Sequence, residues 1–526
     1  MDGRRRSAKG LSRRDAIKGM AGGAIGAGLS SGNPKALAAS QTARTRPTNP
    51  RAAERPIWRL DRPKPALPSS YFWTWDHSTN WMWDDPGMLN FGCNNRYFKR
   101  AETFLEDYRR LTDLTAGLGV KSIVVWGFLR DVHGGIESAK RVVDYAASRG
   151  VAIMPGFGTN EYGGAYYEGE HPYNMTTFLK KHSDARSIRE DGTPRRRWCV
   201  CPTHPRFREW IQGAFRWLFR EFDVGGANVE NGDFLLCHCP RCKQLRSDWA
   251  EDEPAFWGHQ HLGYAPVMEA VKDLLERKLI AWATYKGFVP GRAPLFVKGM
   301  DGWERHAYME CQRPALLDKL PRQAVCQWTL SYMVRVDRVR PLSLTTYLDN
   351  GTPEEALSND KWPAELSPPA ARNVGFVHQG SQWTRHAPRY EQVVSTIKEA
   401  CLRAYRAGME GVSIHGEVSS MHVPWALNYL AFSHFVHWPE DSLRQFGIKT
   451  LGQVLGSAEE GEVFAELFAH WDAGSLAEPQ KKDIQRRSKA LEGAVLGGAH
   501  LDRWRFWNWL SSMVERRQDA HTVSVF

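Results

Sequence analysis

Residues 121–155, KSIVVWGFLRDVHGGIESAKRVVDYAASRGVAIMP, contain two short apolar runs separated by a longer helical pattern. The runs Ser122–Trp126 and Val151–Pro155 are rich in Val and Ile, which favours buried strands. Between them, Ile136–Arg149 carries apolar residues at three- and four-residue spacing, and Gly150 suits the end of that helix. The pattern predicts a βαβ unit, in which a helix joins two parallel strands.

The same alternation continues on both sides of this unit. Six more strands are expected, at Tyr71–Trp75, Gly226–Glu230, Pro294–Lys298, Ala324–Leu330, Val374–Gln379 and Gly411–His415. The clearest other helices are expected at Ala101–Leu118, Pro205–Phe222, Pro266–Tyr285 and Pro388–Ala407. Eight strand–helix units predict an α/β fold, a (β/α)8 TIM barrel over residues 69–440. No Gly-x-Gly-x-x-Gly turn follows the first strand, which weighs against a dinucleotide-binding fold.

Strand signals stop after Pro439. Residues 441–526 are expected to form a helical C-terminal appendage, with helices at Phe446–Leu455, Glu462–Trp471 and Gln480–Leu496.

The beginning of the chain resembles a twin-arginine export signal. Arg13 and Arg14 precede a weakly apolar, Gly-rich stretch, Gly19–Leu29, and Ala36-Leu37-Ala38 offers a cleavage site. A signal over residues 1–38 implies passage through the twin-arginine translocase to the periplasm or the outside, and a basic disordered tail is the alternative. Residues 39–68 are polar and Pro-rich, which is typical of a linker.

The net charge of +11 indicates little about a partner, because the first 38 residues hold eight Lys or Arg against two Asp and so carry six of these charges. Without a basic stripe or a nucleic-acid motif, no nucleic-acid partner is expected. No uninterrupted apolar run of about 18 residues occurs, so no membrane span is expected.

The compositional outlier is Trp, with 22 copies. Aromatic faces stack on sugars, although a large barrel also buries Trp in its core.

Carboxylates follow two of the expected strands. The fourth strand ends at Glu230, with Asp233 just beyond it, and Glu417 follows the eighth. Active sites of this fold form at the C-terminal ends of the strands. Two carboxylates facing one mouth suit glycosidic-bond cleavage, in which one protonates the leaving oxygen and the other attacks or activates water. Strands four and eight lie across a barrel from each other, which favours the wide spacing of an inverting mechanism. The alternative is that these carboxylates cap helices or pair with Arg.

Other residues at strand ends are expected to bind substrate or to hold its contacts in place. They are Trp75, Asp76, His77, Trp126, Asn160, Glu161, Lys298, Asp301, His378, Gln379 and Trp383.

Five of the nine cysteines fall in two loops that should open on the same face of the barrel. They are Cys199 and Cys201 before the third helix, and Cys237, Cys239 and Cys242 after the fourth strand. Such dense spacing predicts a structural zinc site held by four thiolates. Disulfides are the competing interpretation, which an oxidising compartment favours over the metal, and free or partly buried thiols are the third. No other cofactor is expected.

The segment Cys201-Pro202-Thr203-His204-Pro205, the strand end Val229-Glu230-Asn231-Gly232-Asp233 and the loop from Cys237 to Cys242 resemble bacterial glycoside-hydrolase-like barrels related to the α-glucuronidase and β-hexosaminidase superfamily. The resemblance covers roughly residues 70–440. It implies a barrel with an acidic end to strand four and a Cys-rich loop. β-Hexosaminidases carry adjacent acidic residues there, whereas Glu230 and Asp233 are separated, so Glu417 is needed as a partner.

The sequence therefore predicts an exported glycoside hydrolase with carboxylate acid/base catalysis, acting on a plant or algal polysaccharide fragment. Two alternatives remain open: a carbohydrate-binding barrel without catalysis, and a metal-dependent hydrolase that uses the Cys-rich loop.

Overall fold

The computed structural model describes residues 59–76, 101–158, 163–195, 199–230, 237–245, 283–288, 325–331, 372–377, 394–416 and 423–472, with single positions between 478 and 510. Contacts within the chain separate Met1–Glu54 from Arg55–Phe526, and every described residue belongs to the second unit. The expected signal, residues 1–38, and most of the expected linker lie outside the described part.

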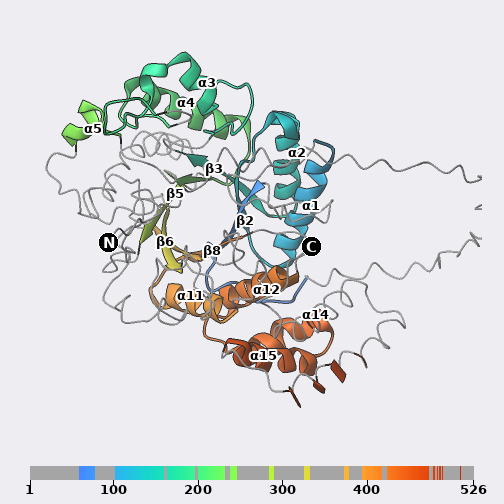
Figure 1. Ribbon diagram of the computed structural model, residues 1–526. Helices are drawn as coiled ribbons and strands as arrows, with labels where there is room; N and C mark the ends of the chain where they lie inside the picture. The colour runs from blue at the N-terminus through green and yellow to red at the C-terminus, as the bar shows by residue number, and fades with distance from the viewer. Residues whose placement is uncertain are drawn as a thin grey trace, which may run out of the picture. The chain divides into compact units, whose positions relative to one another are not determined.

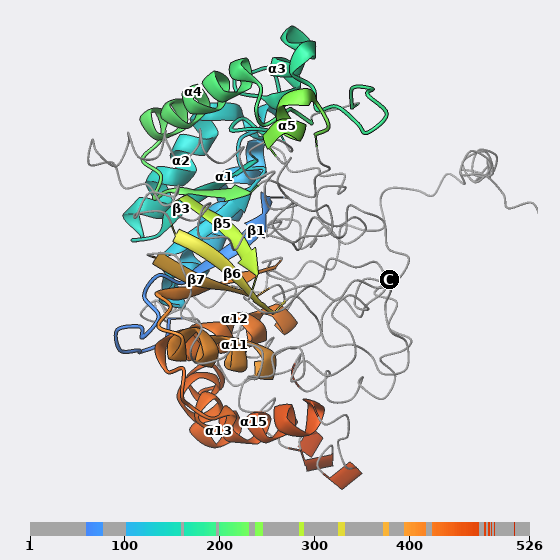
Figure 2. The ribbon, with the colours of Figure 1, turned by 90° about the vertical axis from the view of Figure 1, so that its left-hand side faces the viewer.

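Eight parallel strands close into a barrel in chain order, with the first strand pairing the eighth. Figure 1 shows the strands in the middle of this unit with helices around them, and Figure 2 shows the strands from the side. The strands are β1 (Tyr71–Trp75), β2 (Ser122–Trp126), β3 (Ala152–Gly158), β4 (Ala227–Glu230), β5 (Ala283–Phe288), β6 (Val325–Ser331), β7 (Arg372–Val377) and β8 (Gly411–His415). The predicted parallel α/β barrel is confirmed.

Helices follow six of the strands. They are α1 (Ala101–Gly117), α2 (Gly135–Ser148), α4 (Pro205–Glu221), α5 (Pro240–Leu245), α11 (Val394–Arg406) and α12 (Val423–His437). A short helix, α3 (Met175–Lys181), precedes α4. Pro205 occupies the first turn of α4, where its missing N–H costs nothing. The segments after β5 and β6 lie outside the described residues.

The expected position of the fifth strand is wrong. Pro294–Lys298 was expected, but β5 is Ala283–Phe288, and the expected helix Pro266–Tyr285 overlaps its first three residues. Over a few residues, Ala-Thr-Tyr suits either a helix or a strand. Pairing with β4 and β6, as in Ala227 with Ala283 and Tyr285 with Cys326, decides in favour of the strand. β7 also differs, because it begins at Arg372 and ends at Val377, before His378 and Gln379.

Strand alternation divides the side chains into an interior set and an outer set. The barrel interior holds one cluster of buried residues, Tyr71, Trp73, Trp75, Val124, Trp126, Met154, Val325, Val374 and Phe376. Alternate residues such as Phe72, Ile123 and Val125 belong to the larger cluster that includes the helices. The interior is therefore packed with aromatic side chains.

A chain of side-chain hydrogen bonds crosses this apolar interior. The indole N–H groups of Trp73 and Trp126 donate to Asn228 Oδ1 at 3.1 and 3.0 Å. Asn228 Nδ2 donates to Gln327 Oε1, and Gln327 Nε2 donates to Ser413 Oγ, both at 3.0 Å. All five residues are buried, so each bond removes an otherwise costly unpaired polar atom. The chain connects β1, β2, β4, β6 and β8.

The region after the barrel begins with four short helical segments. They are α13 (Leu443–Phe446), a π-helical turn η9 (Gly447–Leu451), α14 (Gly452–Leu455) and α15 (Ala458–Asp472). This confirms the first part of the predicted helical region, while most of Gln480–Leu496 is outside the described positions. The helix α12 was not predicted, because it is apolar on all faces and shows no helical period.

The end of the expected linker lies against this region. Leu67 is buried, and its N–H donates to the carbonyl of Val436 in α12. The Asp61 N–H donates to Gln453 Oε1 in α14 at 2.9 Å. Asp61 and Leu67, both within the expected linker, therefore contact the helices α14 and α12. Within the described part of the chain, no helix combines the length and apolarity that crossing a membrane requires.

Candidate functional site

The C-terminal end of β4 carries one of the positions predicted for catalysis, and the described part of the chain stops one residue before the other. Glu230 is the last residue of β4, and its backbone lies in register with Gly158 of β3. The N–H of Gly416 donates to the Trp73 carbonyl at 3.0 Å, which places the chain just after β8 against β1. Glu417 is the next residue. In the ring, three strands separate β4 from β8 on either side, so these two strands lie in opposite walls.

Most of the other predicted site residues lie outside the described part of the chain. These are Asp233, Glu417, His77, Asn160, Glu161, Lys298, Asp301, His378, Gln379 and Trp383. Lys298 and Asp301 were predicted as site residues because they lie at the end of the expected fifth strand. That reason is wrong, because β5 ends at Phe288 and neither residue directly follows it. For Glu230, the described part of the structure is the backbone alone.

Trp75 and Trp126 lie side by side at the ends of β1 and β2. Their ring centroids are 5.5 Å apart, and their backbones are in register. Trp126 is 0% exposed and hydrogen-bonded to Asn228, so it supports the interior instead of presenting a free face. Trp75 is 4% exposed, and its ring lies 6.2 Å from that of Tyr167. Tyr167 comes from the segment after β3 and was not predicted.

Asp76 was predicted to bind substrate or to hold its contacts in place, and its carboxylate is bound to side chains of the protein itself. Its side chain is 0% exposed, and Oδ1 accepts a 2.7 Å hydrogen bond from the Tyr108 hydroxyl of α1. Oδ2 lies 3.2 Å from Nε2 of His133. Because Trp75 faces the interior, the next residue faces the helices. Asp76 therefore fastens the end of β1 to α1 and to the turn before α2.

His415 is an interior residue that the sequence reasoning passed over. It ends β8, is buried, and packs edge-on against Trp73 with ring centroids 4.5 Å apart. It shares a face with Ser413, two residues earlier in the strand. The two-residue spacing of Ser413 and His415 within the strand was the sequence signal that could have identified His415 as an interior residue.

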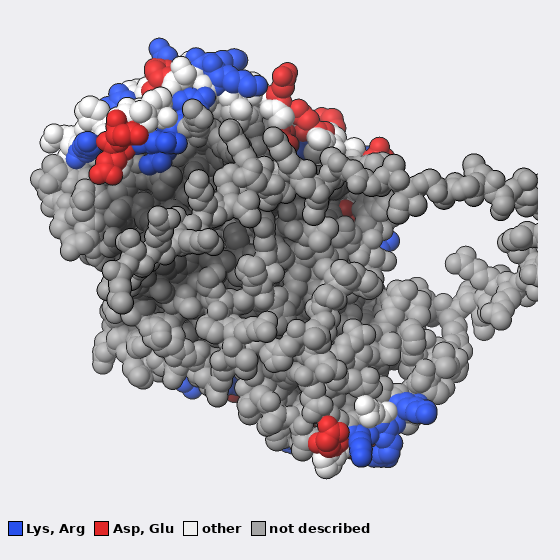
Figure 3. Space-filling view, in the orientation of Figure 1, with Lys and Arg blue, Asp and Glu red and all other residues white. Residues whose placement is uncertain are grey.

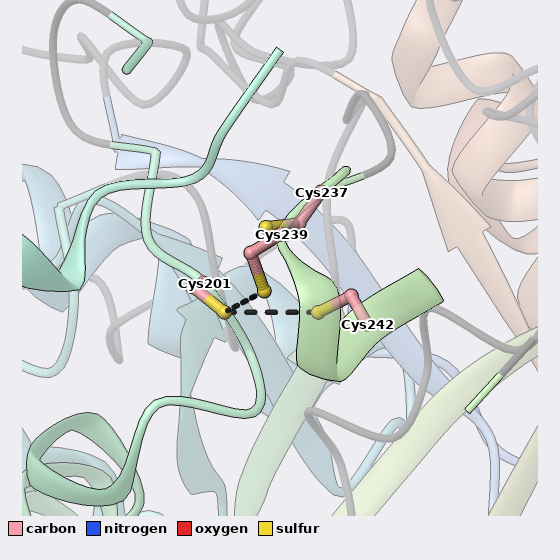
Figure 4. A group of neighbouring side chains, drawn as sticks. All are labelled: Cys201, Cys237, Cys239 and Cys242. Atoms are coloured by element: carbon pink, nitrogen blue, oxygen red, sulfur yellow. Dashed lines mark hydrogen bonds between the residues drawn. The ribbon is translucent and has the colours of Figure 1, made fainter. Parts of the chain in front are cut away.

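Four of the five predicted cysteines meet at one point. The sulfur atoms of Cys201, Cys237, Cys239 and Cys242 all lie within 4.8 Å of one another, and all four residues are buried. Figure 4 shows Cys201 on the segment before α4, Cys237 and Cys239 on the loop that leads into α5, and Cys242 on α5 itself. Cys201 Sγ is 3.6 Å from Cys239 Sγ and 3.7 Å from Cys242 Sγ. This donor set suits a soft metal ion.

Cys199 does not belong to this group, which corrects the five-residue prediction. It is buried, but its sulfur is not among the four that lie within 4.8 Å of one another. None of the six cysteines whose side chains the structure describes forms a disulfide. A disulfide needs sulfurs about 2.05 Å apart.

The environment of the cluster favours one thiolate. Hydrogen bonds from Cys201 and Cys242 lower the pKa of Cys237, and the Ile188 N–H, 3.4 Å from the sulfur, acts in the same direction. The pKa of Cys201 is raised to about 12, mainly because it donates to Cys237. Of these two sulfurs, Cys237 therefore loses its proton more readily than Cys201.

The described surface carries both signs of charge. In Figure 3, basic and acidic side chains are interspersed. The ion pair between Lys140 Nζ and Glu221 at 2.6 Å is one example from α2 and α4.

Comparison with known proteins gives distant structural similarity. No protein-family model and no curated protein sequence matches the chain. Among solved structures, the chain is similar to a GH138 enzyme targeting pectin rhamnogalacturonan II (11% identity, 76% of this chain, 43% of that chain, TM-score 0.40). It is also similar to the GH20 β-N-acetylhexosaminidase from Streptomyces coelicolor (10% identity, 76% and 70%, TM-score 0.40). A third is the maltogenic alpha-amylase AmyB from Thermotoga neapolitana (10% identity, 71% and 77%, TM-score 0.39).

This chain spans less than half the length of the GH138 enzyme. Similarity at this level says nothing about activity, and the barrel is established by the strand pairing of the chain itself.

Proposed function

We propose that the protein is a glycoside hydrolase that cleaves a polysaccharide or oligosaccharide by carboxylate acid/base catalysis. The observation that carries the proposal is the position of Glu230 as the last residue of β4 in a closed parallel barrel. In this fold, residues at the C-terminal ends of strands perform the chemistry.

The second carboxylate in the proposal is Glu417, two residues beyond β8. Because β4 and β8 lie in opposite walls, the proposal has a sugar between them meet one carboxyl group on each side. One protonates the leaving oxygen, and the other activates water on the opposite face of the ring. Asp233 is the alternative proton donor, with Glu230 then orienting the substrate.

The sugar-contacting surface in the proposal is aromatic. Tyr167, which is partly buried, lies next to the buried Trp75 where β1 ends, and Arg130 lies over the Tyr167 ring at 4.6 Å from its centroid. Aromatic rings provide stiff apolar area for the C–H faces of a sugar. The remaining strand-end residues of the sequence prediction, such as His378 and Trp383, complete this surface in the proposal.

The proposed location is the periplasm or the outside of the cell. The support is the Arg13-Arg14 pair before a mild apolar stretch. Replacing both by Lys should retain the chain in the cytoplasm, and cell fractionation measures this. Unchanged export would refute the signal.

The activity is tested with the full chain on a panel of plant and algal polysaccharides and oligosaccharides. Release of new reducing ends, identified by mass spectrometry, is expected for one glycan class. Saturable binding of a glycan without cleavage would favour the carbohydrate-binding barrel and refute the hydrolase.

The metal-dependent hydrolase is the weaker alternative. Catalytic zinc keeps one coordination position for water, whereas the described cluster offers four thiolates. Such a set has no position left for a substrate.

A further inference from the structure

The cysteine cluster lies where three segments of the chain meet. Cys201 precedes α4, Cys237 and Cys239 precede α5, and Cys242 is in the first turn of α5. The third segment is residues 186–195, whose Ile188 packs against the cluster. Backbone hydrogen bonds join the same pieces, from the His238 N–H to the Ile188 carbonyl and from the Cys201 N–H to the Ala185 carbonyl, at 2.9 and 2.8 Å.

From this convergence we infer that Cys201, Cys237, Cys239 and Cys242 bind one structural zinc ion that fastens the β4–α5 loop to the segment before α4. The inference is independent of the proposed activity. Cys199 and Cys401 take no part in the site.

The sulfur spacing supports a tetrahedral site. A regular tetrahedron with zinc–sulfur distances of about 2.3 Å has sulfur–sulfur edges of about 3.8 Å. The separations of Cys201 Sγ from Cys239 Sγ and Cys242 Sγ, 3.6 and 3.7 Å, agree with such an edge. A disulfide would require a pair at roughly half this distance.

The surroundings fit a structural ion. All four side chains are buried, so the ion would be closed off from solvent. The Ile188 N–H points to Cys237 Sγ, and the Thr203 hydroxyl oxygen lies 3.2 Å from Cys242 Sγ and 3.3 Å from Cys201 Sγ. Hydrogen bonds of this kind orient thiolates and disperse their charge.

The site would also restrain the loop after β4. Only residues 231–236 separate Glu230 from Cys237. A metal that fixes Cys237, Cys239 and Cys242 fixes the far end of that loop, while β4 fixes its beginning. The ion would thus act on the position of the loop and have no contact with a reacting sugar.

Elemental analysis of the full-length protein, purified under anaerobic conditions without chelator, tests the inference. About one zinc per chain is expected, and Cys242→Ser should lower this content at least about 5-fold, because thiolates supply the affinity. The matched control Cys199→Ser, another buried cysteine, should keep it. No metal in the wild-type protein, iron in place of zinc, or full zinc content in Cys242→Ser would overturn the inference.

A second measurement guards against a Cys242→Ser variant that does not fold. Cobalt(II) is exchanged into the wild-type and Cys199→Ser proteins, and the absorption spectrum is recorded. Intense sulfur-to-cobalt charge-transfer bands together with the visible bands of tetrahedral cobalt are expected in both. An octahedral spectrum without sulfur bands, or two disulfides found by mass spectrometry after denaturation without reductant, would contradict the site.

Discussion

The indole N–H of Trp73 donates to the side-chain oxygen of Asn228 at 3.1 Å, across the inside of the barrel from β1 to β4. Asn228 accepts a second indole bond from Trp126 and donates to Gln327. One carboxamide therefore satisfies three buried polar groups on three other strands. It also lies two residues before Glu230, so it holds the strand that ends at the proposed catalytic position.

Asn228→Ala should destabilise the protein by about 3 kcal/mol, since it leaves buried N–H groups of Trp73 and Trp126 without their acceptor. The free energy of unfolding in urea measures the effect. The control is Gln485→Ala, which removes an exposed carboxamide and should change stability by less than about 0.5 kcal/mol. Equal stabilities for the two variants would show that the hydrogen-bond chain contributes nothing.

Gly156 in β3 is required by the neighbouring Trp126. A Cβ at this position would lie 2.3 Å from Cδ2 of the indole, inside the contact distance of real side chains. Gly156→Ala should therefore cost about 2 kcal/mol or more by overpacking. Gly213→Ala in α4 is the matched control, because its Cβ would meet only the Tyr173 hydroxyl, at 3.1 Å. Calorimetry should show a lower Tm for Gly156→Ala alone, and an unchanged Tm would contradict the close packing.

Stability should fall in mild acid because of two buried histidines on α12. Burial lowers the pKa of His434 to about 3 and that of His437 to about 4, from an ordinary value of 6.5. The cations Arg62 and Lys449 reinforce the shift for His434. Asp441 Oδ2 lies 3.3 Å from His434 Nε2 and 2.7 Å from Lys449 Nζ, and the net effect of these neighbours and of burial is to lower the pKa of His434. Between pH 6.5 and 4 the unfolded chain binds more protons than the folded chain, so stability decreases as the pH falls.

His437→Gln should flatten this pH dependence. The histidine Nδ1 lies 2.6 Å from the Ser433 carbonyl, and glutamine keeps an N–H for it without titrating. Urea unfolding at pH 7 and pH 4.5 should show a loss about 2 kcal/mol smaller in His437→Gln than in the wild type. His182→Gln, outside α12, serves as the control. If the unfolding free energy of His437→Gln fell with pH as steeply as that of the wild type, the attribution of the pH dependence to His437 would be refuted.

The opposite placement of β4 and β8 predicts an inverting reaction, because carboxylates across a barrel mouth are more readily about 6.5–9.5 Å apart than about 5 Å. Proton NMR of the first-formed product should show the anomer opposite to that of the substrate. A product that retains the substrate configuration would reject inversion.

The sequence predicted the barrel because the strand runs rich in Val, Ile and aromatic residues are separated by periodic helices. Prediction failed where local patterns were ambiguous. Ala283–Tyr285 was predicted as the end of a helix, although these residues begin β5. The helix α12 was missed because it has no polar face that would reveal a helical period. Only contacts between distant strands and helices decide such cases.

For the candidate site, the sequence identified the four cysteines that converge but added Cys199, since spacing does not show which sulfurs point to a common centre. Asp76 was grouped with the substrate-binding residues, although side chains alternate along a strand and the residue after the interior Trp75 should face the helices. The hydrogen-bond chain through Asn228 and Gln327 was not foreseen, because it depends on strands about 100 residues apart.

The central claim is most directly tested by the rate of glycan hydrolysis after Glu230→Gln and Glu417→Gln. On the glycan found by the panel, kcat of each variant should fall at least about 100-fold, the contribution of a positioned proton-transfer group. Glu440→Gln, which alters an exposed carboxylate after α12, should remain within about 2-fold of the wild type. Wild-type turnover in both Glu230→Gln and Glu417→Gln would contradict carboxylate catalysis at this end of the barrel.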